Sequence, residues 1–316
     1  MGDGRRGNRL KNPHVPIDVI QVPMAIGANR PGVDLGAAQL DAAMRSRLAA
    51  RGFDEVVERL NASRCVDVEP LGQAREPGNV ETLHVDSIAA PCQELADAVE
   101  ASVRTGNLAL VLGGDHALSI GSLAGASSAG RLGVIWLDAH GDINTPETSP
   151  SGNVHGMPLA TAIGRGPKAL TDIGSRADLS FEDLVYIGLR DLDPGERALL
   201  RDSPALVYPI SSVETLGVAA ITYEAIRRLF ERGVDAVHLS FDLDVLDPGI
   251  MPGTGTPVPG GLTYREAHHM LSLIRASDLP IVSVDVVELN PLLDCTGGSL
   301  DVAAGLTSVL LGEELV

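Results

Sequence analysis

The chain has 316 residues, of which 44% are hydrophobic, and its 42 acidic and 24 basic side chains give a formal charge of −18 at pH 7. No apolar run reaches the roughly 18 residues that span a bilayer, and no basic stripe could displace counterions from phosphate, which argues against membrane and nucleic-acid partners. The polar first 14 residues lack the apolar segment of a secretory signal. We therefore expect one domain over residues 1–316 of a cytoplasmic protein, with a flexible N-terminal extension over residues 1–14.

Short β-branched or aliphatic runs alternate along the chain with amphipathic stretches. The strands are expected at Ile17–Val22, Leu108–Gly113, Leu132–Asp138, Leu184–Leu189, Val234–Asp242 and Pro280–Leu289. The helices between them are expected at Gly36–Gly52, Ser87–Arg104, Ile221–Gly233 and Thr263–Ala276. This alternation predicts an α/β fold, a single three-layer domain whose mainly parallel sheet has helices on both faces.

Acids or histidines follow five of the expected strands. They are Asp115 and His116; Asp138, His140 and Asp142; Asp191 and Asp193; Asp242 and Asp244; and Glu288. In parallel sheets, ligand-binding groups gather at the carboxyl ends of the strands. The sequence therefore predicts a polar site at this one edge.

The spacing within two of these groups indicates metal binding. Side chains alternate along an extended chain, so Asp138, His140 and Asp142 can face one side together, as can Asp242 and Asp244. Four carboxylates packed together would repel and take up protons unless a cation neutralised them. An oxygen-rich site with a few imidazoles suits manganese better than zinc, and a carboxylate can bridge two ions about 3.5 to 4 Å apart. We therefore expect two Mn²⁺ per chain and a hydrolytic reaction.

Two plainer explanations compete with metal binding. The stretch "GGDHALSIG" around His116 suggests a phosphate-binding loop, but it fits neither the dinucleotide nor the P-loop pattern. Turn chemistry alone could explain Asp, Gly and Asn in "DAHGDIN" (Asp138–Asn144), but turns do not require carboxylates at the ends of several core strands.

Seven motifs resemble those of the ureohydrolase family, and within it most closely those of the arginases. They are "GGDH", "DAHGDIN", "SGNVHGMP", "GLRDLDPGE", "SFDLDVLDP", "TGTPVPGGLTYRE" and "DVVELNP", in this order from about Val22 to the C-terminus. The resemblance implies the three-layer fold of that family and a homotrimer or homohexamer. It also implies a cationic guanidino substrate, L-arginine.

The resemblance implies a ligand set, which the spacing alone left open. One ion would be held by His116, Asp138, Asp142 and Asp242, and the other by Asp138, His140, Asp242 and Asp244. Asp138 and Asp242 would thus bridge the ions. A bridging hydroxide would attack the guanidinium carbon to give L-ornithine and urea, with Asp142 passing a proton to the departing amine.

The resemblance also implies roles for residues outside the ligand set. His155 matches the proton shuttle and Glu288 the acid that binds the guanidinium group. Groups around the substrate α-carboxylate are expected at Asn144, Ser151 and Asn153. Groups around its α-amino group are expected at Asp193 and Glu196, and Thr256 fits a further pocket position.

Several alternatives stay open from the sequence. Agmatinase acts on a substrate without an α-carboxylate, so the motif "SGN" before "HG", followed by "RDLDPGE", favours arginase. Formimidoylglutamase acts on a substrate with an anionic end, which the charge of Asp193 would repel. A non-catalytic metal-binding regulatory protein and a single-zinc deacetylase-like enzyme are further possibilities. Gly141 departs from the larger residue of some family members, and the segment after Leu293 matches loosely.

Overall fold

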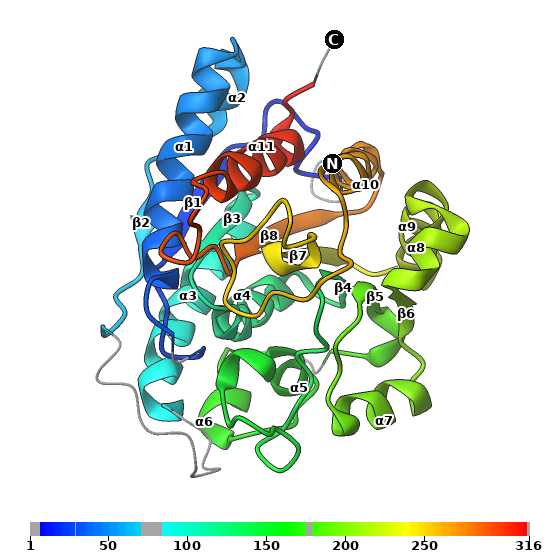
Figure 1. Cartoon of the computed structure of the whole chain (residues 1–316). Helices are drawn as coiled ribbons and strands as arrows, with labels where there is room; N and C mark the ends of the chain where they lie inside the picture. Colours follow the sequence, from blue (N-terminus) through cyan, green and yellow to red (C-terminus); the bar gives the residue numbers. More distant parts are fainter. Residues whose placement is uncertain (1–6, 29, 71–83, 175–178, 315–316) are drawn as a thin grey trace.

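A parallel β-sheet forms the centre of the molecule (Figure 1). The computed structural model describes residues 7–28, 30–70, 84–174 and 179–314. In these residues the strands are β1 (Ile17–Val22), β2 (Arg64–Cys65), β3 (Leu108–Gly113), β4 (Leu132–Leu137), β5 (Leu184–Leu189), β6 (Leu206–Pro209), β7 (Ala236–Asp242) and β8 (Ile281–Val287). Their order is β2-β1-β3-β8-β7-β4-β5-β6, and every neighbouring pair is parallel.

Helices cover both faces of the sheet (Figure 1). They are α1 (Gly36–Ala50), α2 (Asp54–Arg59), α3 (Val85–Thr105), α4 (Ser119–Ala126), α5 (Pro158–Ala162), α6 (Lys168–Thr171), α7 (Pro194–Asp202), α8 (Ile210–Leu216), α9 (Val218–Arg232), α10 (Tyr264–Ala276) and α11 (Ser299–Leu311). The apolar sides of α1, α9, α10 and α11 pack into one core cluster, and those of α3, α4 and α5 pack into another. Each strand residue of β3, β4, β5, β7 and β8 is buried, as a sheet covered on both faces requires.

The predicted three-layer α/β fold is confirmed. β1, β3 and β5 have the predicted bounds, and β4, β7 and β8 lie within theirs. The edge strands β2 and β6 were not predicted, because two and four residues are too few for an alternating pattern to show. The helices α2, α5, α6, α7, α8 and α11 were also missed.

The carboxyl end of β3 lies very close to the chain that follows β1. A Cβ on Gly114 would come within 1.9 Å of the Met24 carbonyl oxygen, so only glycine fits there. The Gly114 amide donates to Val22, and the Asp115 amide donates to Met24. The glycine pair of "GGDH" thus joins two strands closely just before His116.

Residues 7–14 pack against the body of the fold. Leu10 has no exposed surface, and the Asn8 side chain donates to carbonyl groups at the end of α10. The buried Arg59 guanidinium donates to the carbonyl groups of Arg9 and Leu10. The first six residues of the expected extension lie outside the described residues, and the single-domain division stays a prediction.

Candidate metal centre and substrate pocket

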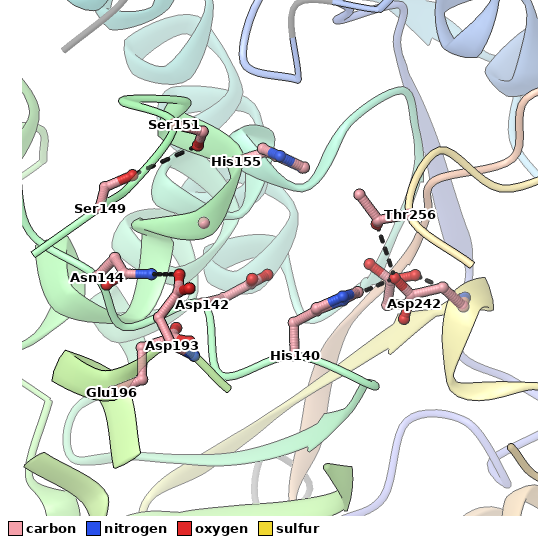
Figure 2. Close-up of a pocket in the computed structure, with 12 residues that line it drawn as sticks. His140, Asp142, Asn144, Ser149, Ser151, His155, Asp193, Glu196, Asp242 and Thr256 are labelled. Atoms are coloured by element: carbon pink, nitrogen blue, oxygen red, sulfur yellow. Dashed lines mark hydrogen bonds and ion pairs between the residues drawn. The ribbon is translucent and has the colours of Figure 1, made fainter. Parts of the chain in front are cut away.

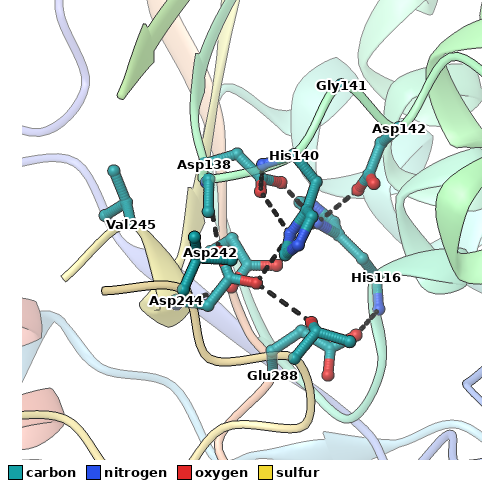
Figure 3. Close-up of polar contacts among 12 residues, drawn as sticks. His116, Asp138, His140, Gly141, Asp142, Asp242, Asp244, Val245 and Glu288 are labelled. Atoms are coloured by element: carbon teal, nitrogen blue, oxygen red, sulfur yellow. Dashed lines mark hydrogen bonds and ion pairs between the residues drawn. The ribbon is translucent and has the colours of Figure 1, made fainter. Parts of the chain in front are cut away.

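Six predicted metal ligands lie together at the carboxyl edge of the sheet (Figure 3). His116 follows β3 and opens a short 3-10 helix, η2 (His116–Leu118). Asp138, His140 and Asp142 follow β4; Asp242 ends β7, and Asp244 lies in η6 (Leu243–Val245). All but His140 are at most 6% exposed. We call His116, Asp138, His140, Asp142, Asp242 and Asp244 the metal-ligand cluster.

Three carboxylates converge on His116. Its Nδ1 lies 3.1 Å from Asp138 Oδ2, 2.9 Å from Asp142 Oδ2 and 2.9 Å from Asp242 Oδ2. The ring nitrogen is buried, yet it makes no hydrogen bond of good geometry with any described residue. A single N–H cannot serve three acceptors, whereas a cation can accept electron pairs from several donors at once.

A second group forms around His140. Its Nδ1 lies 2.9 Å from Asp244 Oδ2 and 3.5 Å from Asp138 Oδ1. Two sets of donor atoms are therefore close enough to hold an ion, His116 with Asp138 and Asp242, and Asp138 with His140 and Asp244. Asp138 belongs to both, with one oxygen directed to each; a second bridge through Asp242 stays a prediction.

The charge state of the cluster also fits a cation. Burial and the nearby Asp138 together raise the pKa of Asp142 to about 6. Burial also raises the pKa of Asp242 well above its ordinary value, with Asp244 and Asp138 adding to the effect. In the described chain, the carboxylates of this cluster form ion pairs only with histidines. Without a metal, protons are thus the only means of relieving their repulsion, so the donor set fits the predicted metal ions.

A pocket of about 110 Å³ opens beside the cluster (Figure 2). Its walls are His140, Asp142, Asn144, Ser149, Ser151, His155, Gly156, Asp193, Glu196, Asp242, Asp244 and Thr256. The metal-ligand cluster supplies carboxylates to one part of the wall. Hydroxyl and amide groups from residues 144–151 and two acids at the start of α7 form another part, and His155, Gly156 and Thr256 complete the wall.

The residues predicted to bind the amino-acid end of a substrate are linked to one another. The Asn144 amide donates to Asp193 Oδ2 at 2.8 Å. Glu196 accepts hydrogen bonds from the backbone amides of Ile143 and Asp193. Burial raises the pKa of Glu196 to about 7. A Cβ on Gly141 would lie 2.9 Å from Glu196 Oε1, so the glycine leaves room for this carboxylate.

Four predicted residues border a second, smaller cavity of about 90 Å³. His155 and Thr256 line both cavities, whereas Asn153 and Glu288 line only the second. The Thr256 hydroxyl donates to Asp244 Oδ2 at 3.2 Å. The predicted guanidinium-binding acid, Glu288, thus lies behind His155 as seen from the first pocket.

His155, which is partly exposed, forms a pair with the buried Glu288. His155 Nδ1 lies 3.1 Å from Glu288 Oε1, which also accepts from the His116 backbone amide at 3.0 Å. Burial acts against a charged imidazole, but the hydrogen bond to Glu288 outweighs it and raises the pKa of His155 to about 9. Glu288 can therefore hold the ring of His155 in one orientation.

Two of these site residues have unusual backbone conformations. Asp142 has φ 49° and Glu288 has φ 66°, and His84 is the only other non-glycine residue of the described chain with positive φ. Such conformations are uncommon for residues with a Cβ and cluster at functional sites. Both residues occur where the chain leaves a strand and turns sharply into the site.

Comparison with known proteins agrees with this geometry. A sequence model described as "Arginase family" matches residues 15–312, which contain the metal-ligand cluster and both cavities. The chain belongs to the arginase family.

Individual members of the arginase family match over nearly their whole length. The arginase of Bacillus caldovelox is 44% identical over 311 residues, which cover 95% of this chain and 99% of the relative. Its native structure matches with a TM-score of 0.86 at 42% identity, covering 96% of this chain and 100% of the other. The structure of Entamoeba histolytica arginase in complex with L-ornithine matches with a TM-score of 0.84 at 32% identity, covering 94% and 99%. Among the described residues, no helix is long and apolar enough to cross a membrane.

Sequence reasoning missed three residues of this arginase-family site. Ser149 lines the first pocket. Ser240 Oγ lies 2.7 Å from His116 Nε2, and Trp136, which the sequence assigned to the strand core, contacts two residues of the metal-ligand cluster. A usable signal existed, because Trp136 and Ser240 each lie two positions before a predicted ligand on a strand and so share its face.

Proposed function

We propose that this chain is an arginase, which hydrolyses L-arginine to L-ornithine and urea. The observation that carries the proposal is the pair of candidate metal groups sharing Asp138, at one wall of a pocket that also holds Asn144 and Asp193. Family membership and 44% identity to a curated arginase support the same reaction.

The proposal includes two Mn²⁺ ions. His116, Asp138, Asp142 and Asp242 would hold one, and Asp138, His140, Asp242 and Asp244 the other. Bound there, the ions supply Lewis acidity that lets water act as a nucleophile near neutral pH. The oxygen-rich donor set, four carboxylates and two imidazoles, favours manganese over zinc.

The chain's own residues would orient the substrate by charge. The guanidinium group would lie beside the metal-ligand cluster, with Glu288 as the acid that binds it. At the other end of the pocket, Asp193 and Glu196 would bind the α-amino group, while Asn144 and Ser151 would bind the α-carboxylate. The Asn144–Asp193 hydrogen bond holds one member of each set together, at 2.8 Å. This arrangement favours an amino-acid substrate.

Proton transfer would use Asp142 and His155. Asp142 lies at the pocket wall, from which it would pass a proton to the departing amine. His155 would exchange that proton with solvent, and Glu288 would hold its ring in place through the 3.1 Å contact. Glu288, Asn153 and Thr256, which line the second cavity, would also bind the substrate.

A substrate comparison tests the reaction. The Mn²⁺-loaded protein should release urea from L-arginine at least about tenfold faster than from agmatine or guanidinobutyrate, because only L-arginine engages both ends of the pocket. Faster release from agmatine would assign the chain to agmatinase. No urea from any of them, with metal bound, would favour a regulatory protein.

Two further measurements separate the remaining parts of the proposal. Elemental analysis should find two metal ions per chain, whereas a deacetylase-like enzyme would hold one. His155→Asn should keep both ions and lose about 100-fold in kcat, the usual range for a general acid–base group. Unchanged turnover would overturn the shuttle assignment.

Assembly and location stay predictions. A homotrimer or homohexamer is expected from the family resemblance and can be checked by sedimentation velocity. A cytoplasmic location is expected from the sequence and can be checked by cell fractionation.

A further inference from the structure

Trp136 is the chain's single tryptophan and lies on β4 with no exposed surface. Because side chains alternate along a strand, Trp136 and Asp138 share one face of the sheet. Packing in the core accounts for the burial of its apolar ring. It does not account for two specific contacts, both of which are with residues of the metal-ligand cluster.

The first contact is a hydrogen bond to the shared carboxylate. Trp136 Nε1 donates to Asp138 Oδ2 at 3.0 Å. This oxygen is the one that faces His116, whereas Oδ1 accepts from the His140 backbone amide at 2.6 Å. Each oxygen of Asp138 is thus held by its own N–H donor, one toward each candidate metal group. A carboxylate oxygen that accepts one hydrogen bond keeps a second lone pair for a metal ion.

The second contact is a ring stack on His116. The two ring centroids are 4.3 Å apart and the ring planes differ by 3°. The indole face is electron-rich, so it attracts an imidazole that has given electron density to a cation. Ser240 Oγ meets the far nitrogen of the same ring at 2.7 Å. With its plane and its Nε2 both fixed, His116 can direct only Nδ1 to the three carboxylates.

We propose that Trp136 is a positioning residue of the metal centre, which fixes the Asp138 carboxylate and the His116 ring relative to each other before an ion binds. This inference rests on the proposed two-metal site. Trp136 lines neither cavity, so it acts through the two ligands and not on the substrate. Its loss should therefore lower metal affinity, and kcat at limiting metal, while KM for arginine changes little.

The decisive variant removes the indole N–H and keeps the shape of the ring. 3-Benzothienylalanine has sulfur in place of the N–H and can be introduced at codon 136 by nonsense suppression. Mn²⁺ binding to the metal-free protein is followed by the EPR signal of free Mn²⁺, so the readout does not depend on activity. We expect at least one dissociation constant to rise about tenfold or more, the range found when partners of metal ligands are removed.

Ile135→Ala is the matched control. Ile135 precedes Trp136 on the same strand, is also fully buried, and packs into the core cluster on the opposite face of the sheet. It should lower the melting temperature of the metal-free protein, yet change the Mn²⁺ dissociation constants by less than about twofold. Trp136→Phe provides a second test, with Ile135→Ala as the reference for lost core volume.

The outcomes are distinguishable. Failure of the wild-type protein to bind Mn²⁺ would overturn the proposed metal centre and, with it, this inference. Wild-type binding with unchanged dissociation constants in the benzothienylalanine variant would overturn the role of Trp136 alone. If that variant does not fold, Trp136→Phe decides, since affinity no lower than that of Ile135→Ala would equally overturn the proposal.

Discussion

Buried acids lie at opposite ends of the same sheet, a cluster of four at one end and a single aspartate at the other, and their charges are balanced in different ways. At the carboxyl edge, the metal-ligand cluster holds four aspartates that form ion pairs only with histidines among the described residues. At the amino edge, just before β5, Asp183 is 1% exposed and is bound by two arginines. Arg131 donates to both of its oxygens, at 2.6 and 2.8 Å, and Arg232 donates at 2.9 Å.

The difference separates a structural acid from a functional one. Arginine is always charged, so Asp183 has permanent counterions and needs nothing further to remain ionised. The carboxylates at the other edge have no such partner, and burial raises the pKa of three of them. A cluster left without fixed cations can bind an exchangeable one.

The largest expected effect comes from the residue common to both candidate metal groups. Asp138→Asn removes one charge from each group, so it should lower urea release on the order of 1,000-fold or more, because even partners of ligands contribute 10- to 100-fold. Elemental analysis should show lost metal. Full metal content with full activity would contradict the shared role.

Asp285 sharpens the comparison, because this buried acid has neither arginine nor a predicted metal role. Its Oδ2 accepts from Ser119 and Ser122 at 2.6 and 2.7 Å and lies 3.2 Å from His238 Nε2. Burial opposes ionisation, but His238 and the two hydroxyls hold the pKa of Asp285 below its ordinary value of 3.8. A carboxyl whose pKa is lowered in the folded protein stabilises the fold at pH values above its ordinary pKa. This stabilisation is lost as the pH falls through the pKa of the folded protein.

Asp285→Asn should therefore lower the free energy of unfolding by about 3 kcal/mol at pH 7. The difference from the wild-type protein should shrink as the pH falls from about 4, where the unfolded chain takes up the proton, through the lower pKa of the folded protein. Urea unfolding of the metal-free protein at several pH values measures both. A pH-independent difference would mean that lost packing, and not lost charge, is responsible.

Substitution of Asp183 at the amino edge should change stability alone. Asp183→Asn leaves two arginines with one weaker acceptor and should lower the free energy of unfolding by about 2 kcal/mol, less than for a fully buried pair because both arginines are partly exposed. Metal content and kcat should be unchanged. Loss of metal from this variant would show that the two edges are coupled.

The smallest effect has the opposite sign. Asp242→Asn should raise the free energy of unfolding of the metal-free protein by about 1 kcal/mol, because it removes one charge from a repelling cluster. With Mn²⁺ present the order should reverse, since the wild-type protein gains binding energy that the variant lacks. Thermal unfolding with and without chelator measures this, and a variant less stable in both conditions would contradict it.

The sequence predicted the site well where strand direction alone decides position. The predicted ligands that follow β3, β4 and β7 lie close together, because parallel strands bring their carboxyl ends to one edge of the sheet. It could not predict that Asn153 and Glu288 would lie in a second cavity. That separation depends on where His155 and Thr256 stand between the two spaces, which is decided by packing between segments about 100 residues apart.

Trp136 is a residue whose burial could be predicted from the sequence but whose contacts could not. Its place in a buried strand was predicted from the apolar run, and it is indeed fully buried. Its contact with His116 depends on a loop after a strand that is not even its neighbour in the sheet. Periodicity reports which face a side chain occupies, but not which residue of another segment it meets there.

The left-handed backbone of Asp142 and Glu288 has a consequence for laboratory evolution. Glycine would adopt φ 49° and φ 66° without crowding a Cβ, so the fold keeps these two side chains against its own conformational preference. Under selection for thermal stability alone, both positions should accumulate glycine or asparagine. Only a selection that also requires urea-releasing activity would keep the two acidic residues.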